Sequence, residues 1–227
     1  MAGDGVELRA GRAPIDRFVW HFTHIDNLRQ ILVDGVLYCD SRVGGRLRSE
    51  VGDRAIKADR RRYRVTCEPG GCPADYVPFY FAPRSPMLYR IARGGVEQYQ
   101  DGQTPLVYLV SKIRDVQQAG LPWVFSNGNC GSPTTDYFND LGLLDAKVDW
   151  NLQEALMWND TADEPNRATR RAAEFLVHDR LPLPVIRWMG VRTSAMASAV
   201  TDLLGDAGSS QRVLVRPRWY FNGQKFR

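Results

Sequence analysis

The sequence predicts an α+β fold built from several short strands, mostly in mixed or antiparallel arrangement. Runs of β-branched and aromatic residues of strand length recur along the chain, and such runs favour strands. Segments with the apolar spacing of helices separate these runs. No repeat, linker or low-complexity segment divides the 227 residues, so a single domain is expected.

The first predicted elements are a strand, a helix and a second strand. Residues 18–24 (FVWHFTH) are rich in strand-forming types and predict the first strand. The pair Asp26-Asn27 precedes apolar residues at helical spacing, so a short helix begins there and ends near Gly35. Residues 36–40 (VLYCD) predict the second, shorter strand.

The next segments contain the strongest turn-forming residues. Residues 42–64 include three glycines, and we predict a loop with at most one helical turn. Residues 76–83 (YVPFYFAP) predict an aromatic strand, which Pro78 places at a sheet edge or gives an unusual exit. Ser85-Pro86 then starts a helix. The remaining predictions are strands over 106–113 and 123–130, a helical region over 140–160, apolar stretches at 173–178 and 184–192, a helix over 195–205 and a strand over 212–221.

Composition excludes several classes of protein. The chain is 44% hydrophobic and 25% charged, which is ordinary for a globular domain and unlike collagen, disordered chains or disulfide scaffolds. We expect a polar, loose lead-in over residues 1–16 and one domain over 17–227. No run of 18 apolar residues occurs, and the start lacks the apolar stretch of a signal peptide. We therefore expect a cytoplasmic protein that does not contact a membrane.

The cysteines and histidines do not form a metal-binding pattern. Cys67 and Cys72 bracket a short EPGG turn, as half of a zinc site would. No second cysteine pair and no histidine pair at ligand spacing follows. We expect no metal, and free thiols in a reducing compartment.

Positive charge is concentrated in one segment. Residues 42–64 hold nine Lys/Arg against three Asp/Glu, an excess of +6 in a chain whose net charge is +4. The rest of the chain therefore sums to −2. Such a patch can contact the phosphates of a dinucleotide or of a nucleic acid, or it is a solvated basic surface.

Three groups of residues are candidates for chemistry. His21 and Thr23 end the first strand, either as structural residues or at the mouth of a cleft. Tyr80 on a strand and Tyr89 on the next helix either pack in the core or clamp a flat ring between them. Glu174 begins an apolar strand, either at its rim or with its carboxylate in a cleft, where it would stabilise developing positive charge.

These residues fall in a pattern that resembles the ADP-ribosyltransferases of the diphtheria-toxin and PARP type. The pattern is His-x-Thr followed by I-L-x-x-G-x-L, then Tyr-Phe-x-x-x-Ser-x-x-x-Tyr, then a late Glu. More narrowly, the chain resembles the DarT family of DNA ADP-ribosyltransferase toxins over most of residues 19–221. The segments that carry this resemblance are WHFTHIDNL, IKADRRRYRV, DYVPFYFAPRSPMLY, RRAAEFLV and RVLVRPRWYF.

The resemblance implies an ADP-ribosyltransferase-like fold, with a split central sheet and flanking helices, and a specific function. DarT enzymes consume NAD to attach ADP-ribose to a base of single-stranded DNA, thymidine in the best-known branch. They act as toxins paired with DarG, a macrodomain antitoxin that removes the modification.

The resemblance also implies roles for individual residues. Glu174 would be the catalytic carboxylate, and Arg60 would assist at the base. Arg61 is the adjacent alternative in the same cluster. NAD would be bound by His21, Thr23, Asn27, Tyr80 and Tyr89, and DNA by Lys57, Arg61, Ser126 and Asn127.

The chemistry explains why these residue types are needed. Breaking the nicotinamide–ribose bond passes through an oxocarbenium-like transition state, as in glycoside hydrolysis. A carboxylate near the ribose stabilises that positive charge, and its loss costs about 10²–10³ in rate. The attacking ring nitrogen must also lose a proton, which a positioned Glu or Arg can assist.

Two alternatives remain open at this point. The same fold could modify guanine in DNA, RNA or a protein. Alternatively, the chain could be an inactive module that binds nucleic acid, although such a module would not need the late glutamate.

Overall fold

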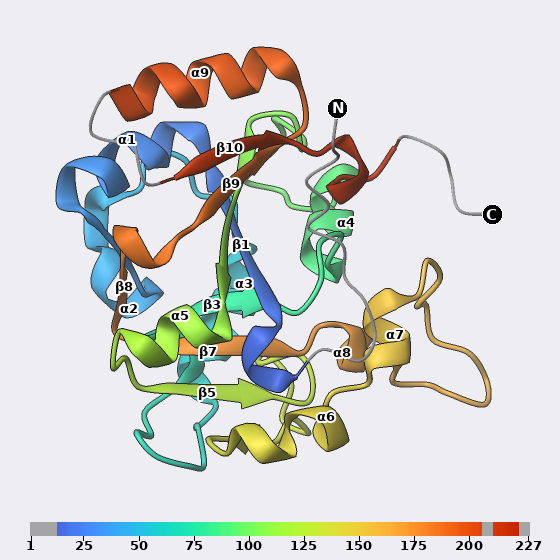
Figure 1. Ribbon diagram of the computed structural model, residues 1–227. Helices are drawn as coiled ribbons and strands as arrows, with labels where there is room; N and C mark the ends of the chain where they lie inside the picture. The colour runs from blue at the N-terminus through green and yellow to red at the C-terminus, as the bar shows by residue number, and fades with distance from the viewer. Residues whose placement is uncertain (1–12, 206–210, 223–227) are drawn as a thin grey trace.

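A mixed sheet of eight strands forms the centre of the computed structural model, which describes residues 13–205 and 211–222 (Figure 1). The strand order is β10-β9-β4-β1-β3-β7-β5-β6, and all neighbours are antiparallel except β9 and β10. This confirms the predicted fold class. The strands are β1 (Phe18–His24), β3 (Tyr76–Tyr80), β4 (Leu106–Lys112), β5 (Trp123–Ser126), β6 (Tyr137–Phe138), β7 (Glu174–His178), β9 (Trp188–Val191) and β10 (Arg212–Val215), and β2 (Val36–Tyr38) pairs separately with β8 (Arg180–Pro182).

The sheet is split between β1 and β3. These strands pair at one position, Trp20 with Tyr80, whereas β1 pairs with β4 along its whole length. Pro78 lies at this division. The prediction of an edge position was wrong, because β3 lies between β1 and β7. The carbonyl oxygen of Pro78, which accepts a hydrogen bond from His21, faces the division between β1 and β3. The nitrogen of a strand residue points to the same side as its carbonyl, so the sheet does not need the N–H that proline lacks.

The helices flank the sheet, and the longer ones have identifiable caps. His24 caps α1 by accepting the Asp26 N–H, and Gly35 ends it in the left-handed conformation. Ser85 caps α4, as predicted. The helices are α1 (Ile25–Asp34), α2 (Asp40–Val43), α3 (Arg54–Arg62), α4 (Pro86–Ala92), α5 (Ile113–Gln118), α6 (Leu144–Lys147), α7 (Trp150–Glu154), α8 (Arg167–Arg171) and α9 (Ser194–Leu204). Short 3-10 turns cover Pro14–Asp16, Gly44–Arg46, Pro73–Asp75, Leu141–Leu143, Leu183–Val185 and Pro217–Trp219.

The basic segment contains a helix of nine residues, α3, rather than the predicted loop with at most one helical turn. The Asp53 side chain caps it by accepting the N–H groups of Ala55 and Ile56. All the glycines of the segment precede this cap, and arginine, lysine and alanine favour helix once it has started. The prediction missed α3 because the helix buries no residue fully and Ile56 is its one large apolar residue.

Both ends of the chain differ in part from the sequence predictions. Within the lead-in predicted over 1–16, residues 1–12 lie outside the described residues, and Asp16 forms an ion pair with Arg114. The strand predicted over 212–221 ends at Val215, because Pro217 begins a 3-10 turn.

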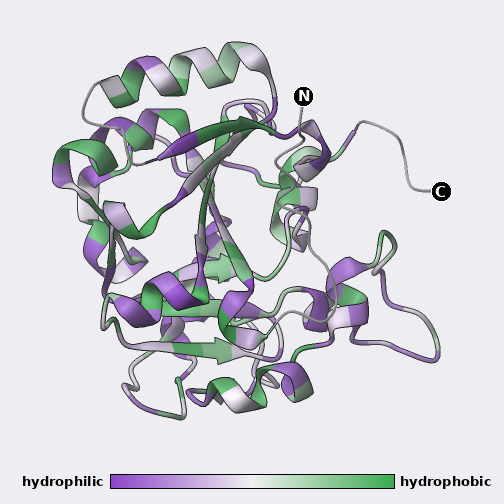
Figure 2. Ribbon diagram, in the orientation of Figure 1, coloured by the Kyte–Doolittle hydropathy of each residue, from purple (hydrophilic) through white to green (hydrophobic). Residues whose placement is uncertain are grey.

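Hydrophobic cores cover both faces of the sheet, and a third, smaller cluster around Tyr76, Val124 and Leu176 packs on β3, β5 and β7. Alternate residues of β1 enter different cores, Val19 on one face and Trp20 on the other. Helices α1, α5, α6 and α9 cover the first face, and α4 with the C-terminal aromatic residues covers the second (Figure 1). Figure 2 shows β5 as mostly hydrophobic and α8 as mostly hydrophilic. Among the described residues, no helix is both long and apolar enough to cross a membrane, and no group of three or more His, Cys, Asp or Glu residues could hold a metal ion.

Replacing Gly190 with alanine is expected to destabilise the fold. A Cβ atom there would lie 2.2 Å from Cζ3 of Trp219. That ring is buried against Trp20 and Tyr108. Overpacking of this kind costs about 1–3 kcal/mol. Urea unfolding of Gly190→Ala measures this loss, and Gly45→Ala, which meets no atom within 4 Å, serves as the control. Equal stability of the two variants would contradict the packing described.

Candidate active site

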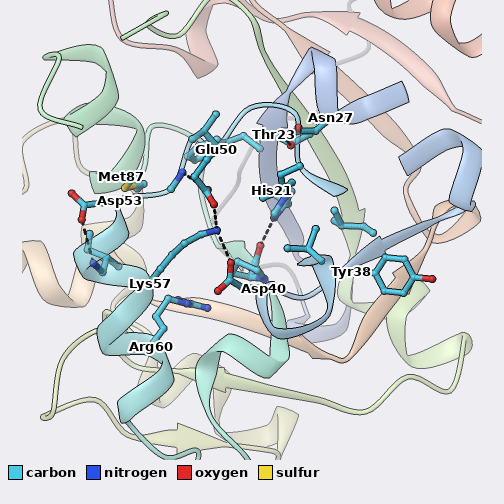
Figure 3. Close-up of a pocket in the computed structure, with 18 of the residues that line it drawn as sticks. His21, Thr23, Asn27, Tyr38, Asp40, Glu50, Asp53, Lys57, Arg60 and Met87 are labelled. Carbon is cyan, nitrogen blue, oxygen red and sulfur yellow. Dashed lines mark hydrogen bonds and ion pairs between the residues drawn. The ribbon is translucent and has the colours of Figure 1, made fainter. Parts of the chain in front are cut away.

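A cavity of about 380 Å³ opens at the division of the sheet (Figure 3). Residues from β1, α1, α3, β3, α4 and β7 line it, together with the segment 34–53 and the loop after β5. It brings together seven of the predicted site residues: His21, Thr23, Asn27, Lys57, Arg60, Tyr80 and Glu174. Ligand sites of proteins are commonly cavities of this size.

Glu174 and Arg60 form a buried ion pair in this cavity. One guanidinium nitrogen of Arg60, Nη1, donates to both carboxylate oxygens of Glu174 at 2.9 and 2.8 Å. The other, Nη2, donates to the Pro73 carbonyl at 3.2 Å. Glu174 is 2% exposed, so the carboxylate lies in the cleft rather than at the rim of the sheet. Burial acts to lower the pKa of Arg60, but the Glu174 carboxylate more than offsets this and raises it. Arg60 is therefore a permanent cation.

Ser126 holds the backbone from which Glu174 projects. The Glu174 N–H donates to Ser126 Oγ at 3.0 Å, and that hydroxyl donates to the Gly128 carbonyl at 2.7 Å. Ser126 is 0% exposed. The buried hydroxyl therefore positions the strand start that carries Glu174, and the DNA contact of Ser126 stays a prediction.

His21 is neutral and presents an acceptor. Its Nδ1 lies 2.8 Å from the Pro78 carbonyl, which can only accept, so Nδ1 carries the proton and Nε2 has a free lone pair. Burial is the main cause that lowers the pKa of His21 to about 4, and the charge of Arg60 acts in the same direction. Figure 3 shows His21 on β1 near Thr23 and Asn27.

Asn27 links Thr23 to the loop before α3. Its Nδ2 donates to Thr23 Oγ1 at 3.2 Å and to the Ser49 carbonyl at 2.7 Å. Its Oδ1 accepts the N–H groups of Arg48 and Ser49 at 2.8 and 2.9 Å. The amide thus makes four hydrogen bonds inside the protein, which is its full capacity. Asn27 lines the cavity, and its contacts make it a residue that positions the wall.

The predicted tyrosine clamp does not form. Tyr80 lines the cavity and stacks on Phe22, with ring centroids 6.3 Å apart. Burial raises its pKa, so its hydroxyl keeps its proton. The ring of Tyr89 instead contacts Trp158 and Phe221, with centroids 5.5 and 5.1 Å away. Met87, two residues earlier on α4, lines the cavity instead, because the helical turn points Tyr89 to another side.

The predicted DNA cations are paired with acids. Lys57 Nζ lies 2.5 Å from both Asp40 and Glu50 (Figure 3). Arg61 also pairs with Asp40, and its side chain is 51% exposed. Asn127 lies outside the cavity lining, where its amide pairs with Asp136.

Sequence reasoning missed several residues of the lining, among them Tyr38, Asp40, Glu50, Met87 and Asn129. Asn129 lies two residues after Asn127, which was predicted to contact DNA. The position of Met87 follows from its spacing of three residues from Arg90, which also lines the cavity. Asp40 and Glu50 gave no signal, since single acids in a polar segment resemble ordinary surface residues.

The arrangement can stabilise a cation and hold a polar substrate. One side of the cavity offers a buried carboxylate with a fixed countercharge. The other, on β1, offers an uncharged acceptor and a hydroxyl. A carboxylate held in this way is suited to a transition state with positive charge on a sugar carbon.

The chain matches one family in its sequence and in its structure. The family model of DarT, ssDNA thymidine ADP-ribosyltransferase, matches residues 20–221. A DNA ADP-ribosyl transferase of Thermus sp. (strain 2.9) is 38% identical over 205 residues, which are 89% of this chain and 95% of the relative. One of Mycobacterium tuberculosis (strain ATCC 25618 / H37Rv) is 36% identical over 214 residues, 92% of this chain and 91% of the relative.

Two solved structures show the same fold. Thermus sp. 2.9 DarT in complex with ADP-ribosylated ssDNA superimposes with a TM-score of 0.84 at 35% identity, covering 91% of this chain and 97% of that chain. The same protein in complex with NAD+ gives a TM-score of 0.80 at 34% identity, covering 92% of this chain and 100% of that chain.

Acidification is expected to weaken the fold through His21. Because its pKa in the folded protein is about 4, the unfolded chain binds this proton first as pH falls. This loss of folding stability is absent above about pH 6.5 and grows as the pH falls toward about pH 4. The free energy of unfolding should therefore decrease less between pH 7 and pH 5 in His21→Gln than in the wild type. Parallel pH profiles would contradict this protonation state.

Removing Arg60 alone is expected to cost more stability than removing the whole ion pair. Arg60→Met leaves a buried, uncompensated carboxylate, which costs about 3–5 kcal/mol. The double variant Arg60→Met/Glu174→Leu leaves no buried charge and should recover part of that loss. Chemical unfolding of both variants measures the difference. A double variant less stable than Arg60→Met would count against a buried pair.

Proposed function

Because the chain belongs to the DarT family of single-stranded DNA thymidine ADP-ribosyltransferases, it is an NAD-dependent DNA ADP-ribosyltransferase, and we propose that it modifies thymidine with Glu174 as its catalytic carboxylate. The observation that supports this role is the position of Glu174, which is 2% exposed, lines the cavity and is fixed by Arg60. Among the described carboxylates that line the cavity, Glu174 alone accepts hydrogen bonds from one arginine on both of its oxygens.

NAD, which is consumed as a substrate, would lie across the division of the sheet. The neutral Nε2 of His21 and the hydroxyl of Thr23 are suited to bind polar groups of its ribose or amide. Tyr80 offers an uncharged aromatic face for the nicotinamide. Met87 occupies the place on α4 that Tyr89 was predicted to fill, so we propose that the nicotinamide contacts this thioether.

The reaction breaks the bond between nicotinamide and ribose C1′ and forms a bond between C1′ and a thymine ring nitrogen. The electrons of the broken bond leave with neutral nicotinamide, and the ring N–H proton is released. Glu174 stabilises the positive charge on the ribose. Arg60, whose pKa is raised by that carboxylate, cannot accept the proton. Its proposed role is to hold the Glu174 carboxylate in place, which leaves Glu174 or solvent as the proton acceptor.

DNA would approach over α3. Of its predicted contacts, Arg61 has the more exposed side chain, at 51% against 20% for Lys57. We assign the phosphate contact to Arg61 and a positioning role to Lys57. Asn127 is half-buried, and its side-chain amide is hydrogen-bonded to Asp136. It would therefore contact DNA only through the exposed part of its side chain.

A macrodomain antitoxin of the DarG type is the proposed partner, and it would remove the ADP-ribose. Family membership supports this proposal. It also supports the proposed role of the chain as the toxin of a toxin–antitoxin pair, because modified thymidine has lost the ring N–H with which it pairs to adenine. The alternative of an inactive module is not supported, since the buried pair of Glu174 and Arg60 is present in the cavity.

The test is the mass of a short single-stranded oligonucleotide after incubation with the protein and NAD. One ADP-ribose should be added when the oligonucleotide contains thymidine. Glu174→Gln keeps an acceptor for Arg60 but loses the charge, and should react about 10²–10³ times more slowly. Glu154→Gln, at an exposed residue, is the matched control.

The experiment separates thymidine from guanine, and both from an acceptor that is not DNA. Addition to a guanine oligonucleotide that lacks thymidine would move the acceptor and keep the mechanism. No addition to any DNA would reject the proposed substrate. Full activity of Glu174→Gln would reject the catalytic role of this carboxylate.

A further inference from the structure

Asn129 is a cavity residue with an unused hydrogen-bond donor. It lies in the loop between β5 and β6 and lines the same cavity as Arg60 and Glu174. Its N–H donates to the Thr169 carbonyl at 3.0 Å, and its carbonyl accepts the Thr135 hydroxyl at 2.6 Å. The backbone of Asn129 is therefore held on both sides.

The orientation of the Asn129 amide follows from its own loop. The Gly131 N–H donates to Asn129 Oδ1 at 2.9 Å. Only the oxygen of an amide can accept, so this contact fixes which atom is Nδ2. Within residues 13–205 and 211–222, no acceptor is recorded for Nδ2. The side chain thus offers two N–H donors to a ligand of the cavity.

The loop of Asn129 lies on the far side of Glu174 from His21. In the order of the sheet, β7 with Glu174 lies between β5 and β1. The loop also packs on α3, because a Cβ atom on Gly131 would lie 3.6 Å from Cγ2 of Ile56. If NAD contacts β1, the acceptor base reaches the ribose from the opposite side, where Asn129 lies.

We propose that Nδ2 of Asn129 donates a hydrogen bond to a carbonyl oxygen of the acceptor base and thereby helps to select thymine. This inference rests on the proposed function. Thymine has one ring N–H, between its O2 and O4 carbonyls, so a base that presents this N–H to the ribose also presents a carbonyl beside it. Cytosine carries an amino group in place of O4, so two donors would face each other if the contact is to O4, and cytosine has no ring N–H to give up in either case.

The sharpest variant is Asn129→Asp, which keeps the acceptor for the Gly131 N–H and removes the donor. Its kcat/KM for a thymidine oligonucleotide should fall about 10- to 100-fold, because a base carbonyl is left unpaired. The dissociation constant for NAD should be unchanged. Asn139→Asp, at an exposed residue outside the cavity, controls for the added charge and should behave as wild type.

Replacing single atoms of the base identifies the contact. Oligonucleotides in which O2 or O4 of thymidine is sulfur weaken acceptance at one carbonyl. Sulfur also alters the acidity of the ring N–H, but it does so equally for every variant. One of the two substitutions should therefore slow the wild type more than it slows Asn129→Ala, as in a double-mutant cycle.

The outcomes separate this inference from the proposed function. Wild-type protein that transfers nothing to thymidine would reject both. Active wild type with equally active Asn129→Asp would reject the role of Asn129 alone. Loss of NAD affinity in Asn129→Asp, or sulfur effects identical in wild type and Asn129→Ala, would likewise show that Asn129 does not bind the base.

Discussion

The buried ion pair of Arg60 and Glu174 constrains the rest of the site. Two charges this far from water are stable only when each is paired and further hydrogen-bonded. The structure meets this condition from both sides. On one side, α3 carries Arg60 and is anchored by the Asp53 cap, whose carboxylate also pairs with Arg90. On the other, Ser126 holds the start of β7, from which Glu174 projects. Helix and strand are thus joined at the carboxylate that we propose to be catalytic.

The position of this pair depends in turn on the split of the sheet. A continuous ladder between β1 and β3 would leave no room for a cavity between them. Pro78 lacks the N–H that such a ladder would use, and its carbonyl is satisfied by the His21 side chain. One contact therefore ends the pairing of the strands and also fixes the tautomer of His21. The same residues serve the fold and the site at this point.

The sequence predicted the elements that have strong local signals. β1, α1 and α4 follow from strand-forming runs, apolar spacing and a Ser-Pro start. Helix α3 was missed because it is bound through ion pairs and not through an apolar face. At the site, the sequence indicated the strand ends that carry His21 and Glu174. It could not show the direction of Tyr89 or the burial of Ser126, because both depend on contacts with residues distant in the chain.

The charge of the basic segment also has to be understood in three dimensions. Counted along the chain, residues 42–64 carry an excess of +6, which suggests a surface made for phosphate. In the fold, Lys57 is paired with Asp40 and Glu50, and Arg61 shares Asp40. Arg60 is buried with Glu174. The cations nearest the cavity are therefore paired with acids of the protein itself. They fix the shape of the cavity wall and add little to its net charge. In our proposal, Arg61, whose side chain is 51% exposed, attracts the DNA backbone, whereas recognition of the base needs neutral donors, which act at short range and are not screened by salt.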